Sequence, residues 1–149
     1  GAFIISSSVF KELDLSMVLN GMLDGLVGIT AGADVISPSN AIIVGLIAGA
    51  IIPLSVVMFD RLKVDDPVGA TSVHLVCGIW GTLAVGIFGK GDFSFITQFI
   101  GAFSVIAFTA LFALAFGFLI KATMGLRVSE EEEIEGLDMG EHGMHAYSI

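Results

Sequence analysis

His74 is the only acidic or basic residue in an apolar stretch of the sequence, Pro67–Gly89, which is 23 residues long. About 20 apolar residues are enough for a helix to cross a lipid bilayer. An ionisable side chain inside such a segment usually marks a pathway, a proton relay or a ligand site. Burial disfavours the imidazolium, so we expect a neutral ring with one nitrogen donating a hydrogen bond and the other accepting one. The alternative is a purely structural hydrogen bond.

A helical period of about 3.6 residues places His74 on a face of small side chains. The residues on this face are Pro67, Ala70, Thr71, His74, Cys77, Gly78 and Gly81, and the larger residues on the opposite face are Val73, Val76, Trp80, Leu83 and Ile87. The small face could border a narrow passage, or it could receive a neighbouring helix. If it borders a passage, the residues that line it beside His74 are Ala70, Thr71, Cys77 and Gly78.

The start of this helix is marked by two carboxylates and a proline. We expect Pro67 in the first turn, where a missing N–H costs nothing. Asp65 and Asp66 precede it, and carboxylates suit a helix N-terminus. Asp24 is a second acid within an apolar segment, with Asn20 one turn earlier as a candidate partner. It could face a water-filled vestibule, meet a polar partner or carry a proton.

Composition defines the class of protein that holds these residues. Of 149 residues, 55% are hydrophobic and 14% are charged, with a mean hydropathy of +0.95. Soluble domains carry about 25% charged residues. A net charge of −9 with six basic residues argues against nucleic-acid binding. The single cysteine excludes an internal disulfide framework. The sequence contains no metal cluster, phosphate loop or nucleophile–base pair, which argues against an enzyme.

The distribution of charge predicts an all-α polytopic membrane protein. We expect four full spans at about 16–33, 35–59, 67–89 and 93–120, and a partial span at 1–10 that is too short to cross. Alternating spans place five of the six basic residues on one side, namely Lys11, Arg61, Lys63, Lys121 and Arg127. The positive-inside rule makes that side cytoplasmic. Residues 1–124 then form the membrane domain, and residues 125–149 form an acidic cytoplasmic tail.

Three segments of the chain resemble one family. Val64–Gly89, VDDPVGATSVHLVCGIWGTLAVGIFG, resembles the signature of the ammonium transporter, methylammonium permease and Rhesus family. Asn20–Thr30, NGMLDGLVGIT, resembles the family's eighth transmembrane helix, and Gly125–Tyr147 resembles its C-terminal region. The segments come in family order and with family spacing. Within the signature, the structural residues are Asp65, Asp66, Pro67 and Trp80.

The resemblance implies an eleven-helix membrane fold of which this chain is the C-terminal fragment. Gly1–Phe10 would be the end of helix seven, and the four spans would be helices eight to eleven, followed by the tail. It also implies a multi-pass protein of the plasma (inner) membrane, a cytoplasmic C-terminus in agreement with the charge count, and a homotrimer with one pore per subunit.

The resemblance further implies nitrogen uptake by transport of ammonium or ammonia, with methylammonium as an analogue and without a cofactor. Family members hold two hydrogen-bonded histidines in a hydrophobic pore, and His74 falls on the second by motif; the first has no counterpart here. Bacterial and archaeal members bind the PII signalling protein at the cytoplasmic face, and the tail couples subunits. The tail positions that match are Gly125, Arg127, Gly136, Asp138, His142, Gly143 and Tyr147.

Four positions depart from the family pattern. Gly69 replaces a frequent acidic residue, Gly140 replaces the phosphorylatable threonine of plant relatives, Ala31 replaces a common proline, and Asp24 replaces a small apolar residue. An alternative reading of the chain is a small, non-conducting membrane protein that binds a PII-like regulator through its tail.

Overall fold

The computed structural model describes residues 1–10 and 15–147, with side chains given for all of these except 9, 10 and 15–17. Within these residues the chain is helical and forms no β-strand, which confirms the all-α prediction. The elements in chain order are α1 (Ala2–Ile5), η1 (Ser6–Phe10), α2 (Leu15–Thr30), α3 (Pro38–Arg61), η2 (Ala70–Leu75), α4 (Val76–Phe88), α5 (Phe95–Thr123), α6 (Glu130–Glu135) and α7 (Leu137–His142).

Three helical segments are long and apolar enough to cross a membrane: Pro38–Arg61, the continuous η2–α4 segment Ala70–Phe88, and Phe95–Thr123. They correspond to the spans expected at 35–59, 67–89 and 93–120. Within the described residues, the segment expected at 16–33 contains a shorter apolar helix, Val18–Thr30. That fourth span therefore stays a prediction, as does the division at residue 124.

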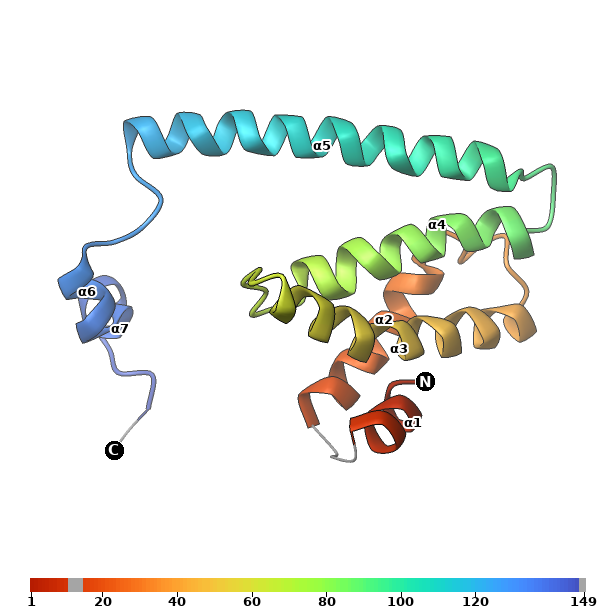
Figure 1. The fold of residues 1–149 in the computed structure, drawn as a ribbon, viewed down its shortest axis with the longest axis horizontal. Helices are drawn as coiled ribbons and strands as arrows, with labels where there is room; N and C mark the ends of the chain where they lie inside the picture. Colours follow the sequence, from red (N-terminus) through yellow and green to blue (C-terminus); the bar gives the residue numbers. More distant parts are fainter. Residues whose placement is uncertain (11–14, 148–149) are drawn as a thin grey trace. The chain divides into compact units, whose positions relative to one another are not determined.

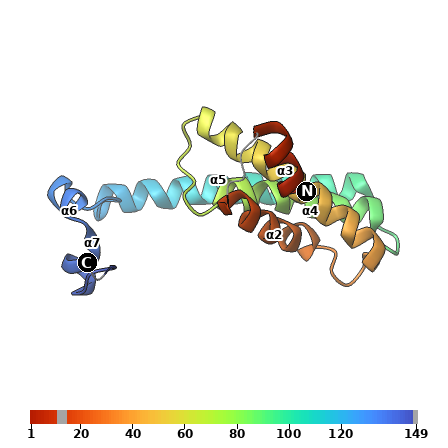
Figure 2. The same cartoon turned by 90° about the horizontal axis from the view of Figure 1, so that it is seen from below.

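The chain divides into two compact units, Gly1–Val105 and Ile106–Ile149. In the first unit, α2, α3 and α4 pack against one another, and α1 packs on α2 and α3 (Figures 1 and 2). Contacts between Gly25 and Gly45 and between Gly21 and Gly49 show that α2 and α3 run antiparallel. The α1 segment lies in the partial span expected at 1–10 and contributes Ala2 to the core.

Two clusters of buried side chains form the core of the first unit. One comprises Ala2, Ala48, Ile52, Val73 and Cys77, and the other comprises Ile36, Val44, Ala84 and Val85. Trp80 packs against both clusters, and its indole Nε1 donates a hydrogen bond to the Val44 carbonyl at 3.1 Å. The indole satisfies its polar atom while covering apolar surface, so Trp80 fixes the position of α4 on α3.

Close backbone approach between helices depends on glycine. A Cβ built on Gly81 of α4 would overlap the carbonyl of Gly28 in α2, and a Cβ on Gly28 would lie 2.9 Å from the Cβ of Ala48 in α3. Small residues allow such approach between membrane helices. Gly28 and Gly81 therefore lie at a close contact between α2 and α4.

In the second unit, the acidic tail folds into two short helices joined at Gly136. Ser129 and Glu132 form a capping box at the start of α6, in which Ser129 N donates to the Glu132 carboxylate at 2.9 Å. Gly136 has φ 87° and ψ 154°, a backbone conformation that is essentially restricted to glycine. The glycine-rich tail accordingly breaks between α6 and α7 rather than forming one long helix.

We predict that Gly81→Ala lowers the thermal stability of the full-length protein in detergent. The added methyl would meet the Gly28 carbonyl, which is backbone and cannot move away cheaply, and overpacking of this kind costs about 1–3 kcal/mol. Gly25→Ala is the matched control, because its new Cβ would lie 4.0 Å from Gly45. Equal melting temperatures for the two variants would show that the helices are not in contact at Gly81.

We also predict that Gly136→Ala unfolds the connection between α6 and α7. A non-glycine residue in this conformation costs about 1–3 kcal/mol, so limited proteolysis of the full-length protein should cut the tail faster. Gly140→Ala is the control, because Gly140 lies inside α7 with nothing within 4 Å of its Cβ position. If both variants resist protease equally well, the positive φ of Gly136 is not needed.

Candidate functional site

His74 lies in η2, a π-helical turn that continues directly into α4. Its backbone N–H donates to the Gly69 carbonyl at 3.1 Å, five residues back, which is the hydrogen bond that defines a π turn. The side chain is exposed in this chain. Within the described residues neither ring nitrogen has a hydrogen-bond partner, so both nitrogens are free to meet a ligand or another segment.

The imidazole lines an open groove between α2 and α4 with a volume of about 430 Å³. The lining residues are Val27, Thr30, Ala31, His74, Gly78 and Thr82. Two hydroxyls join the ring as polar groups, and each is already donating within its own helix. Thr30 Oγ1 donates to the Leu26 carbonyl at 2.6 Å, and Thr82 Oγ1 donates to the Gly78 carbonyl at 2.9 Å. Because their protons are used in these bonds, the hydroxyls of these two lining residues can serve a ligand only as acceptors.

The structure brings only part of the predicted small-residue face to this groove. Gly78 lines it beside His74, whereas Ala70 and Thr71 are not among its lining residues. Cys77 is fully buried, and its Sγ lies 3.8 Å from the Ala48 carbonyl. A π-helix such as η2 has more residues per turn than an α-helix. A period of 3.6 residues therefore assigns the side chains around His74 to the wrong faces of the helix.

Sequence reasoning missed four lining residues. Thr82 lies two i+4 steps from His74 through Gly78, so helical spacing could have suggested it. Val27, Thr30 and Ala31 belong to α2 and its C-terminal end. The local pattern of either segment does not say which helix packs beside which, so no sequence signal would have placed them opposite His74.

The helix start differs from the prediction in one respect. Pro67 lies in a turn before the helix, not in its first turn, and the helix begins at Ala70 after Gly69, which has φ 75°. Asp66 reaches across this turn and accepts from the backbone N–H groups of Thr71 at 3.1 Å and Ser72 at 2.8 Å. Asp65 is exposed. One carboxylate therefore satisfies two N–H groups at the start of η2.

These hydrogen bonds control the charge of Asp66. Desolvation by itself would raise the pKa of the carboxyl group, but the hydrogen bonds from Ser72 and Thr71 favour the charged form and hold its pKa well below the usual range. The side chain is negatively charged throughout the physiological range, beside the positive end of a helix dipole.

The matched tail positions take defined places in the second unit. Gly125, Gly136 and Gly143 have positive φ, and Arg127 forms an ion pair with Glu133. The Asp138 carboxylate accepts from the backbone N–H of Ala146 at 3.1 Å, so it ties the end of the tail to α7. His142 ends α7, and Tyr147 is exposed.

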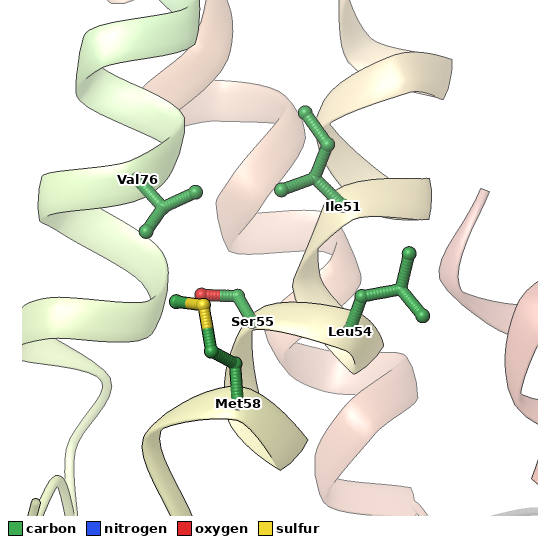
Figure 3. Close-up of a pocket in the computed structure, with 5 residues that line it drawn as sticks. All are labelled: Ile51, Leu54, Ser55, Met58 and Val76. Carbon is green, nitrogen blue, oxygen red and sulfur yellow. The ribbon is translucent and has the colours of Figure 1, made fainter. Parts of the chain in front are cut away.

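A second groove in the first unit is almost purely apolar. It has a volume of about 210 Å³ and is lined by Ile51, Leu54, Ser55, Met58 and Val76. Figure 3 shows the Ser55 and Met58 side chains of α3 turned toward Val76 of α4. Ser55 Oγ donates to the Ser72 carbonyl at 3.3 Å. None of the five residues that line this groove is titratable. Within the described residues, no group of three or more His, Cys, Asp or Glu side chains could hold a metal ion.

Comparison with known proteins gives a consistent result. A sequence model of the Ammonium Transporter Family matches residues 1–147. A Synechocystis protein named as an ammonium transporter is 46% identical over 135 residues, which cover 89% of this chain and 30% of that protein. Ammonium transporter Amt2 of Methanocaldococcus jannaschii is 41% identical over 154 residues, covering 96% of this chain and 36% of that protein.

A third relative, ammonium transporter Amt1 of Haloferax mediterranei, is 38% identical over 151 residues, covering 98% of this chain and 29% of that protein. The chain thus spans about a third of the length of the curated relatives it matches. The groove that contains His74 lies wholly within the matched third.

We predict that Asp66→Ala lowers the melting temperature of the full-length protein at neutral pH, because removing a carboxylate that caps a helix costs about 0.5–2 kcal/mol. The folded pKa of Asp66 is depressed, so its stabilisation is present above the unfolded pKa and is lost as pH falls through the folded pKa. The difference from wild type should therefore shrink only in strongly acidic buffer.

Asp65→Ala is the matched control for this experiment, since Asp65 is the exposed neighbouring acid. Its melting temperature should stay close to that of wild type at every pH. A loss of stability equal to that of Asp66→Ala would mean that the two acids act through net charge and not through the helix start.

Proposed function

Because the chain belongs to the ammonium transporter family, we propose that the His74 groove forms part of a path for ammonium or ammonia across the membrane. The observation that carries this proposal is the chemistry of the groove. Its polar side chains are an imidazole and two threonine hydroxyls whose protons are already donated within their helices. Such a surface offers acceptors to a ligand rich in N–H groups, and the rest of the lining is apolar or small.

The groove is open on one side in this chain, and the relatives are about three times as long. We therefore expect the remaining part of the full-length protein to close it into a pore. The family resemblance supplies a second imidazole from that part, opposite His74. The unpartnered ring nitrogens of His74 suit such a contact.

A charged ion crosses a dry passage of low dielectric only at high cost. A neutral His74 imidazole can accept a proton from NH₄⁺, which leaves NH₃ and an imidazolium. The neutral NH₃ then moves through the apolar part of the pore. The imidazolium passes its proton onward, by way of a neighbouring acceptor, to the far side, where NH₃ takes it up again. The net transported species follows from whether that proton crosses or returns.

The membrane setting of this proposal follows from helix lengths and charge. The protein is a multi-pass membrane protein, and the excess of basic residues on one side favours a cytoplasmic C-terminus. The family resemblance favours the plasma (inner) membrane. The folded acidic tail would then lie in the cytoplasm. The ion pair of Arg127 with Glu133 and the hydrogen bond from Ala146 to Asp138 hold the tail in a defined shape. This supports a defined binding surface there, for a neighbouring subunit of a homotrimer or for a PII-like regulator.

We predict that His74→Ala in the full-length protein reduces methylammonium uptake roughly 100-fold, the lower end of what a positioned proton acceptor contributes. Uptake of labelled methylammonium into proteoliposomes measures this directly. His145→Ala is the matched histidine control, because His145 is exposed in the tail. It should leave uptake unchanged.

Two results would contradict the proposal. If His74→Ala keeps the uptake rate and substrate selectivity of wild type, the groove is not on the path. If the wild-type protein itself takes up no methylammonium, a non-conducting membrane protein that works through its tail becomes the better account.

A further inference from the structure

Asp24 is a fully buried acid in the middle of α2. Neither Oδ1 nor Oδ2 has a hydrogen-bond partner, and the described residues contain no ion pair that includes it. Asn20, the candidate partner one turn earlier, is not bonded to it. Because none of the Asp24 side chain is exposed, a further segment of a longer protein cannot reach its carboxyl group without rearranging this bundle.

The surroundings of Asp24 are the junction of α2, α3 and α4. Cys77 of α4 lies within electrostatic reach of its carboxyl group, and the Cys77 thiol is itself directed to the Ala48 carbonyl of α3. Gly28 lies one turn further along α2, and a Cβ added to it would contact Ala48 and Trp80. The cluster around Cys77 is otherwise apolar. The carboxyl group thus lies in the packed interior of the bundle, near Cys77 of α4.

Among the residues that the structure describes, the elements packed here bring no compensating charge. Neither α1 nor η1 contains a titratable side chain, and those of α3 are Asp60 and Arg61 at its exposed end. On η2 the titratable residue is His74, which turns to the groove, and on α4 it is Cys77. A carboxylate at this place would therefore be an unpaired buried charge.

An unpaired buried charge is so costly that the group is neutralised instead. A metal cation would need several oxygen ligands, and the described residues provide no such cluster. A proton needs only one carboxyl oxygen. We propose that Asp24 is a reversible proton-binding site buried behind the wall of the His74 groove, neutral at rest and negatively charged after it releases its proton.

The surroundings of this site adjoin the groove. Val27, three residues after Asp24, lines the groove and also packs against the cluster that contains Cys77. Cys77 lies between His74 and Gly78 in the chain, both of which line the groove. A negative charge on Asp24 would attract a cation in the groove across a medium that screens poorly. This consequence rests on the proposed function, whereas the proton site itself does not.

Infrared difference spectroscopy of the full-length protein in membranes tests the proton site without any transport. The C=O stretching band of a protonated carboxylic acid should persist at neutral pH and shift in D₂O. Asp24→Asn should remove that band. Asp34→Asn is the matched control, because Asp34 is an exposed acid just after α2, and it should keep the band. A band of unchanged size in Asp24→Asn would overturn the proposal.

Asp24→Ala serves as a second variant in case the asparagine amide, which is also polar, prevents folding at this buried position. If either variant folds, as judged by its oligomeric state and melting curve, the band must be lost in it. If neither variant folds, titration of the wild-type band against pH still tests whether a buried carboxyl group holds a proton. A band that disappears together with those of exposed acids well below neutral pH would overturn the proposal.

Uptake of labelled methylammonium into proteoliposomes tests the link to the groove. In wild type the apparent affinity for methylammonium should tighten as pH rises through the titration of the infrared band. In Asp24→Asn the affinity should lose this pH dependence, and in Asp34→Asn it should keep it. Retention of the dependence in Asp24→Asn would refute the link. Absence of wild-type methylammonium uptake with an intact band would instead refute the proposed function and leave the proton site standing.

Discussion

Backbone contact between Gly28 of α2 and Gly81 of α4 holds these helices closer than side chains would allow. Gly28 also contacts Ala48 of α3, so the three helices meet at residues with small side chains or none. Interactions between helices in lipid come from such packing and from polar contacts, because lipid tails are as apolar as leucine. The groove that contains His74, Gly78 and Thr82 opens beside this contact, so its walls are set by the glycines.

Polar side chains in the bundle bond directly to backbone carbonyls of the neighbouring helix. Trp80 donates to the Val44 carbonyl, Cys77 approaches the Ala48 carbonyl, and Ser55 donates to the Ser72 carbonyl. These three side chains find backbone acceptors between α3 and the η2–α4 segment, as most buried polar groups do. The two acids Asp66 and Asp24 form a contrast. Asp66 is held by two N–H groups at a helix start. Asp24 lies fully buried and has no hydrogen-bond partner among the residues that the structure describes.

Part of the site was accessible from sequence, because it depends on local signals. An uncharged run around His74 is enough to predict a helix of membrane-spanning length, and Asp66 before Pro67 indicates a helix start. The interior of that helix was predicted less well. The π turn at Ala70–Leu75 shifts the phase of the side chains, so Cys77 faces the core although the simple period placed it with His74.

The sequence by itself determined the helical class and the approximate position of the long apolar helices. These follow from hydrophobicity and charge, whose effects act over a few residues. Only the tertiary structure decided that α2 faces His74, that Thr30 and Thr82 turn acceptors toward the same groove, and that Asp24 is sealed among three helices. The choice of packing partner depends on the shapes of surfaces distant in the chain, and no local pattern encodes it.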